Sequence, residues 1–331
     1  EKEVKMLGED EDGNLEGKIE EMPHQLNSNE TITIEIEIKA EITPRTAPKI
    51  DTDKAGRIQD IPQNLRERYC KLNGLWNRSK KAETLAKEIV GNETNALKAL
   101  FKLIRWMENN IRLPISTGLR NPTYPDGTLN TLEGDCDDQA NLLVAMLRTI
   151  GIPAYTQLSF IYMKGRSVNE TMYDDHYHLE SMNIGGHGWA RAYIPPWGWL
   201  NIDMTYFTPY KFEDGKLTSY NPVDHIIGAA VYSFKALITE DIVKRDYIEE
   251  VNSWMKDMKR YNLKWEEEYN MEYTAKIEDQ NLNIDPTIIL ALSGIAGTIV
   301  AILAFYVYAK RKRVKEETFT LNNKRKKIET L

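Results

Sequence analysis

The chain has 331 residues and a formal net charge of −7, with 43 Lys and Arg against 50 Asp and Glu. This length accommodates one mid-sized domain with appendages, and the acidic balance argues against nucleic acid as a partner. The two cysteines, Cys70 and Cys136, are too few for a disulfide framework, so a hydrophobic core must stabilise the fold.

The first 60 residues divide into two segments. Residues 1–30 are acidic and lack hydrophobic periodicity, which predicts a flexible leader. From Thr31 to Ile42, apolar and polar residues alternate strictly, which predicts one long strand. Pro44 and Pro48 then interrupt the pattern. Residues 31–60 are therefore expected to form a β-rich N-terminal segment or to extend the sheet of the main domain.

Residues 61–245 are expected to form that main domain, and its first elements are predicted to be helices. Residues 79–90 have the pattern of a surface helix with its charges on one side. Asn95 to Asn110 carries an apolar stripe at helical spacing. The residues of this stripe are Ala96, Leu97, Leu100, Leu103, Ile104 and Met107.

Cys136 is predicted to be the first residue of a helix. Asp135 is a suitable N-cap, apolar residues follow at helical spacing up to Ile150, and Gly151-Ile152-Pro153 ends the pattern. The free N–H groups at a helix N-terminus favour a thiolate and can donate to an oxyanion. A buried structural cysteine is the alternative for this motif by itself. Three neighbouring carboxylates raise the pKa of the thiol: Asp135, Asp137 and Asp138.

His187 and Asp203 are predicted on neighbouring strands. The run from His187 to Ile194 has strand character, residues 195–198 are typical of a turn, and the chain returns over Trp199 to Asp203. The two side chains share a face if the loop has an odd number of residues or if a bulge shifts the register. A thiol, an imidazole and a carboxylate in this order are the parts of a cysteine acyl-transfer site. A core histidine beside a turn aspartate is the alternative.

These three motifs together resemble the transglutaminase-like superfamily, which has a papain-like cysteine-enzyme fold. Its motifs are a Cys opening a helix that ends in Gly-Ile-Pro-Ala, a His before Ala/Gly-Trp, and an Asp in Trp-x-x-x-Asp-Pro-Thr. The matching segments here begin at Cys136, His187 and Trp199, and Met204 replaces the usual Pro. The resemblance covers roughly residues 95–210.

The resemblance implies an α+β fold in which the helix carrying Cys136 packs on an antiparallel sheet carrying His187 and Asp203. It implies acyl transfer from glutamine or peptide carbonyls through a thioester, with either water or an amine as the acceptor. The family also has an oxyanion helper upstream of the cysteine. Trp106 and Asn130 are the candidates here, although core packing is the favoured role for Trp106.

No metal or cofactor is predicted. His176 and His178 lie in an acidic stretch, Asp174 to Glu180, which could bind a metal, but a solvated polar loop or strand edge is favoured. The aspartates at 135–138 do not have the spacing of a calcium-binding loop.

The C-terminal part contains a predicted membrane segment. Phe234 to Asn270 is highly charged, so residues 246–286 are expected to form a helical stalk or helices packed on the core. Residues 287–309 carry no charge and are long enough to cross a bilayer. Residues 310–331 carry nine Lys or Arg against three Asp or Glu, whereas the remainder of the chain carries 34 against 47.

This charge distribution predicts a cytoplasmic tail at 310–331 and an extracytoplasmic main domain. That orientation requires a signal segment, which we expect was removed before Glu1. Without such a segment, a tail-anchored protein with the reverse orientation gains support. Small residues on one face of the membrane helix could support a homodimer. They are Ser293, Gly297 and Ala301.

The leading hypothesis is a membrane-anchored, microbial or archaeal type of cysteine acyl-transfer enzyme that acts outside the cell on protein or peptide substrates. Hydrolysis of the thioester is expected to exceed cross-linking. A catalytically silent surface module that keeps the fold for binding is the first alternative, and a stalked structural protein of the envelope is the second.

Overall fold

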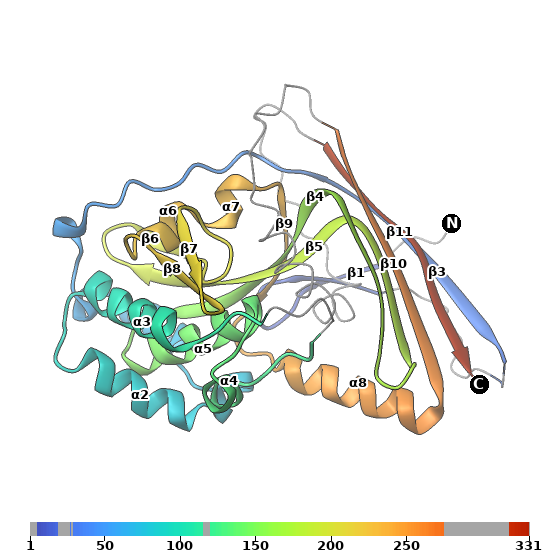
Figure 1. Cartoon of the computed structure of the whole chain (residues 1–331), viewed down its shortest axis with the longest axis horizontal. Coiled ribbons are helices and arrows are strands. Elements are labelled where there is room, and N and C mark those ends of the chain that lie inside the picture. Colours follow the sequence, from blue (N-terminus) through green and yellow to red (C-terminus); the bar gives the residue numbers. More distant parts are fainter. Residues whose placement is uncertain (1–4, 19–26, 28, 115–119, 275–317, 331) are drawn as a thin grey trace.

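The computed structural model describes residues 5–18, 27, 29–114, 120–274 and 318–330. Helices α2 to α5 gather at one end of the molecule and the strands β3, β10 and β11 lie at the other, with the hairpin β4–β5 running between them (Figure 1). The helices are α1 (Gln63–Tyr69), α2 (Lys80–Val90), α3 (Ala96–Asn110), α4 (Pro125–Thr131), α5 (Cys136–Thr149), α6 (Asp224–Ile227), α7 (Ala230–Ser233) and α8 (Tyr247–Tyr261).

The main sheet has the strand order β3-β11-β10-β5-β4-β9, and β6 also pairs with β5. Neighbouring strands are antiparallel, except that β10 runs parallel to β5. The predicted antiparallel sheet is therefore a mixed sheet. The strands are β3 (Thr31–Glu41), β4 (Ala154–Met172), β5 (Tyr177–Ile194), β6 (Gly198–Ile202), β9 (Ala236–Ile242), β10 (Leu263–Thr274) and β11 (Thr318–Thr330), with separate hairpins β1 (Lys5–Glu9)–β2 (Leu15–Lys18) and β7 (Tyr210–Glu213)–β8 (Lys216–Ser219).

Helix α5 is the central helix of the core. Every residue from Cys136 to Arg148 is buried, and the helix packs on β5 and β4. Arg148, near the C-terminal end of the helix, is also buried. Its guanidinium donates hydrogen bonds to the backbone carbonyls of Ala154, Lys71 and Val243. A helix enclosed on all sides is held rigidly, so the position of its first residue is well defined.

The helices predicted at 79–90, 95–110 and 136–150 are confirmed as α2, α3 and α5. The strand predicted at 31–42 is confirmed as β3. The remainder of the segment 31–60 contains short 3₁₀ helices at 52–54 and 58–60 instead of further strands. Proline has no N–H for a strand ladder, which is consistent with the end of β structure before Pro44.

The prediction of a flexible leader over residues 1–30 is wrong for residues 5–18, which form the β1–β2 hairpin. The acidic residues between the strands make specific bonds instead of remaining solvated. Asp10 Oδ1 accepts the N–H groups of Asp12 and Asn14, which closes the turn. The Asp12 carboxylate in turn accepts N–H groups from residues 243–245 and so attaches the hairpin to the main domain.

The prediction of helices throughout 246–286 is correct for α8 and wrong for residues 263–274, which form β10. Trp265, Tyr269 and Met271 lie on one face with strand periodicity, but Glu267 occupies the position between them and hides the alternation. The Glu267 carboxylate is buried because it accepts hydrogen bonds from Tyr177 and Tyr269 hydroxyls. Because Glu267 is charged, the sequence pattern of residues 263–274 indicated a solvated segment and not a strand with a buried face.

The predicted membrane segment, residues 287–309, lies outside the described residues. None of the helices in the described part of the chain has the length and apolarity that a bilayer crossing requires. Residues 318–330, predicted in a cytoplasmic tail, form β11 between β10 and β3. A strand in this sheet cannot lie across a bilayer from the rest of the sheet, so the two arrangements are mutually exclusive.

Candidate active site

Cys136 is the first residue of α5 and is 1% exposed. Its sulfur accepts a hydrogen bond from the N–H of Gly188 on β5. A Cβ at position 188 would lie 3.3 Å from Asp137 Cβ and 3.1 Å from Leu158 Cδ2, so glycine permits the start of α5 to approach β5 this closely. The thiol is thus held against the residue that follows His187.

The Cys136 thiol is surrounded by carboxyl groups. Burial raises its pKa well above the ordinary value, and the neighbouring Asp135 and Asp137 raise it further. The upward direction predicted for the effect of Asp135 and Asp137 on the thiol pKa is confirmed. Burial and the Asp137 charge also raise the pKa of Asp135, and burial is the main cause that raises the pKa of Asp138 to about 8.

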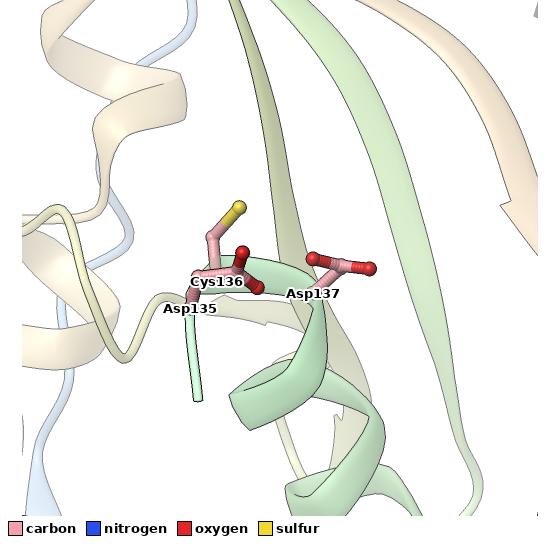
Figure 2. Close-up of side chains that lie close together, drawn as sticks. All are labelled: Asp135, Cys136 and Asp137. Carbon is pink, nitrogen blue, oxygen red and sulfur yellow. The ribbon is translucent and has the colours of Figure 1, made fainter. Parts of the chain in front are cut away.

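Figure 2 shows the side chains of Asp135, Cys136 and Asp137 together at the start of α5. One ligand atom from each lies within 4.8 Å of the others. Asp137 Oδ2 accepts the Tyr247 hydroxyl at 2.7 Å, and Tyr247 in turn accepts from Asn141 Nδ2 at 2.7 Å. A thiolate and two carboxylates could hold a divalent cation such as zinc, with Asp137 already engaged by α8.

His187 and Asp203 are joined by a buried hydrogen bond. His187 Nε2 lies 2.8 Å from Asp203 Oδ2, and the two residues are 1% and 0% exposed. In the β5–β6 hairpin Ile194 pairs with Gly198, which leaves three residues in the loop. The expectation of an odd loop that puts both side chains on one face is therefore confirmed. Because Nε2 faces the carboxylate, Nδ1 is the ring nitrogen left to exchange a proton.

The Asp203 carboxylate is held by N–H groups on both oxygens. Oδ1 accepts from the backbone of Thr205 at 3.2 Å and of Tyr206 at 2.9 Å, and Oδ2 accepts from Ala230 at 3.1 Å in addition to His187. Tyr206 also packs edge-on against the His187 ring, with the centroids 5.7 Å apart. The backbone after β6 thus fixes the acid, and the acid fixes the imidazole.

The two predicted oxyanion helpers have other contacts among the described residues. Trp106 is half-buried on α3 and packs against the hydrophobic core, which agrees with the packing role favoured for it. Asn130 is exposed on α4 and accepts a hydrogen bond from Lys81 Nζ. The Cys136 contacts described above involve neither side chain.

The two histidines considered as metal ligands lie at the far end of the β4–β5 hairpin. His176 Nδ1 bonds to the Leu263 carbonyl at 2.8 Å, and His178 Nδ1 bonds to Thr171 Oγ1 at 2.9 Å. Their ring nitrogens therefore face different partners instead of one shared point.

A second buried histidine, His225, contacts the main chain of Asp203 and is not among the residues predicted from the sequence. His225 Nδ1 is 2.7 Å from the Asp203 carbonyl oxygen, and His225 Nε2 is 2.9 Å from Glu108 Oε1. Glu108 follows Ile104 by four residues, so it falls on the apolar stripe of α3. A charged residue on a buried face is the signal that could have drawn attention to this pair.

One comparison with known proteins covers the region of this site. A profile of the transglutaminase-like superfamily matches residues 83–204, which contain Cys136, His187 and Asp203. No curated protein matches the chain. Among solved structures, the chain is similar to a candidate cysteine protease from Cytophaga hutchinsonii, with 19% identity over 66% of this chain and 79% of that chain and a TM-score of 0.33.

It is also similar to the periplasmic domain of TgpA from Pseudomonas aeruginosa, with 16% identity over 62% of this chain and 82% of that chain and a TM-score of 0.31. A candidate protease from Parabacteroides distasonis is 14% identical over 80% of this chain and 52% of that chain, with a TM-score of 0.27. From the matching profile and the three motifs, the segment spanning residues 83–204 belongs to the transglutaminase-like superfamily.

Proposed function

We propose that this protein is a cysteine-dependent acyl-transfer enzyme that acts on protein or peptide carbonyls through a thioester. The observation that carries the proposal is the buried bond of 2.8 Å between His187 and Asp203, next to the helix that begins at Cys136. An imidazole oriented by a carboxylate and adjacent to a thiol is the arrangement by which cysteine enzymes activate their nucleophile.

In the first half-reaction, the Cys136 proton passes to His187 Nδ1 and the thiolate attacks the substrate carbonyl carbon. The oxygen of the tetrahedral intermediate is negatively charged, and free N–H groups in the first turn of α5 are the available donors for it. Collapse of the intermediate breaks the C–N bond. The leaving amine takes the proton from His187, and the acyl group remains on the sulfur as a thioester.

In the second half-reaction, water or an amine attacks the thioester and gives a proton to His187. The C–S bond breaks, the sulfur recovers a proton from the imidazolium, and the acid or amide product leaves. Asp203 stabilises the imidazolium in both halves and keeps the tautomer that leaves Nδ1 free to accept. We propose water as the default acceptor, because it needs no binding site of its own.

The burial of the site supports a second candidate function. Cys136 and His187 are each 1% exposed, so a substrate carbonyl reaches the sulfur only after neighbouring groups move. A groove of about 600 Å³ lies nearby, and its lining includes Thr208 and Gly228 but neither of the two candidate catalytic side chains. A closed site of this kind also suits a silent module that keeps the fold for binding.

Turnover separates the two functions. The protein is incubated with a glutamine-containing peptide, with and without a primary amine, and the products are read by mass spectrometry. The enzyme hypothesis predicts a deamidated or cleaved peptide that disappears in Cys136→Ala and persists in the matched control Cys70→Ala. Binding of the peptide without any mass change in the wild-type protein would favour the silent module.

We further propose that residues 287–309 anchor the enzyme in a membrane with its main domain outside the cytoplasm. In this anchored form residues 318–330 lie on the cytoplasmic side, so they do not pair with β10 and β3. The support for this is the uncharged segment followed by a basic tail. A homodimer through Ser293, Gly297 and Ala301 is part of the same proposal. Protein or peptide substrates suit an extracytoplasmic domain, and nucleic acid does not suit an acidic chain.

A further inference from the structure

The segment that carries Asp203 is held by the chain around α6. The Asp203 N–H donates to the His225 carbonyl at 2.9 Å, and the Thr208 N–H donates to the Gly228 carbonyl at 3.1 Å. The Phe207 ring also lies against the His225 ring, with the centroids 3.8 Å apart. Residues 203–208 are therefore clamped onto residues 225–230 by backbone bonds and by one ring contact.

The His225 side chain connects this clamp to α3. Its Nδ1 faces the Asp203 carbonyl oxygen at 2.7 Å, and its Nε2 faces Glu108 Oε1 at 2.9 Å. His225 is 0% exposed and Glu108 is 3% exposed. A hydrogen bond from each nitrogen to an oxygen acceptor requires a proton on each nitrogen.

Glu108 has the partners of an ionised carboxylate. Oε1 accepts the Ser219 N–H at 2.6 Å, and Oε2 pairs with Arg105 at 2.8 Å. Burial alone would raise its pKa, but the hydrogen bonds from His225 and Ser219 outweigh burial and lower it to about 2. Donors therefore face both oxygens of Glu108, and the ring nitrogen is the donor in its hydrogen bond with His225.

We propose that His225 is a buried imidazolium that positions Asp203 for the His187 bond, with Glu108 of α3 as its counter-ion. This inference rests on the proposed function and adds two residues to its site. His225 does not touch the reacting atoms. It acts through the Asp203 main chain, because its Nδ1 binds the carbonyl of the residue whose carboxylate binds His187.

Two amide substitutions of His225 test its two ring nitrogens separately, because each keeps a donor near only one of them. In His225→Asn the amide nitrogen falls near the place of Nδ1 and can still donate to the Asp203 carbonyl. In His225→Gln it falls near the place of Nε2 and can reach Glu108, while the Asp203 carbonyl loses its donor. His178→Gln, at a half-exposed histidine near the hairpin tip, is the matched control.

If His225 positions Asp203, His225→Gln should lower kcat by about tenfold or more and leave KM within about twofold. The reason is that a small displacement of a catalytic group greatly lowers the rate. His225→Asn should retain the higher kcat of the two, and His178→Gln should match the wild type. Equal kcat in the two His225 variants, or wild-type kcat in His225→Gln, would overturn the inference. Activity that persists in Cys136→Ala would instead refute the proposed function.

Nitrogen NMR of the histidine rings tests the protonation of His225 in the wild-type protein, without relying on the folding of a variant. With ¹⁵N-labelled histidine, the proposal predicts two ring N–H signals and imidazolium nitrogen shifts for His225 at neutral pH. It also predicts a displaced His187 Nε2–H signal in His225→Gln, which a purely structural role of His225 would leave unchanged. A neutral His225 ring in the wild-type spectrum would overturn the proposal.

Discussion

Replacing Asp203 by Asn tests the proposed geometry most sharply, because all four hydrogen bonds to this carboxylate come from N–H donors. An Asn side chain has one oxygen, so it can accept at one of the two positions and presents an NH₂ group to donors at the other. If the NH₂ group faces His187, the ring must adopt the other tautomer, in which Nδ1 carries the proton and cannot accept one from Cys136.

The hydrogen bonds of Asp203 determine how much kcat and the free energy of unfolding should fall in Asp203→Asn. The tautomer change predicts a loss in kcat of about 10⁴-fold with some residual turnover, as for an orienting acid in an analogous triad. Two hydrogen bonds to a buried charged group are lost at about 1.5–3 kcal/mol each, so the free energy of unfolding should fall by about 3–6 kcal/mol. Steady-state kinetics and chemical denaturation measure the two quantities on the same preparation.

Asp214→Asn is the matched control, since Asp214 is an exposed turn residue with a left-handed backbone that Asn tolerates. It should keep wild-type kcat and stability. An Asp203→Asn protein that is folded and has wild-type kcat would show that the reasoning is wrong and that Asp203 does not orient His187.

Gly188→Ala should lower the free energy of unfolding by about 1–3 kcal/mol and should also lower kcat, because the added methyl group meets Asp137 at the start of α5. Unchanged thermal denaturation and kinetics would contradict this. The folded protein retains the Asp138 proton up to about pH 8 whereas the unfolded chain releases it near 3.8, so stability should fall as pH rises through this window. Denaturation curves measured against pH should be flatter in Asp138→Asn, and an equally steep dependence would contradict this. Protease added to intact cells should degrade residues before Asp285 and spare the C-terminal tail; loss of residues 318–330 together with the domain would favour their pairing in the sheet.

The local chemistry of the site was predictable because it depends on short-range signals. Asp135 before an apolar helical pattern placed Cys136 at a helix start, and the turn at 195–198 placed His187 and Asp203 on one hairpin. Each of these signals is contained within about 20 residues. The register of the hairpin was left open between an odd loop and a bulge, and the structure has the odd loop.

Long-range partners could not be predicted in the same way. Glu267 lies on a buried strand face because tyrosines from two strands satisfy it, and Glu108 lies on a buried helix face because His225 and Arg105 satisfy it. A sequence pattern assigns such carboxylates to solvent, since their partners are remote in the chain. The same reason explains the β1–β2 hairpin, whose Asp12 binds backbone more than 200 residues away.

The central claim is that Cys136 carries the acyl group, and trapping the acyl-enzyme tests it most directly. The protein is mixed with the glutamine peptide, quenched in acid, digested and mapped by mass spectrometry. The account predicts a peptide containing Cys136 that is heavier by the mass of the donor less its leaving amine, which is ammonia for a glutamine side chain and the C-terminal fragment for a peptide bond. This adduct should be present in Cys70→Ala and absent in Cys136→Ala. Turnover that continues in Cys136→Ala, with no adduct on Cys136 in the wild-type protein, would contradict it.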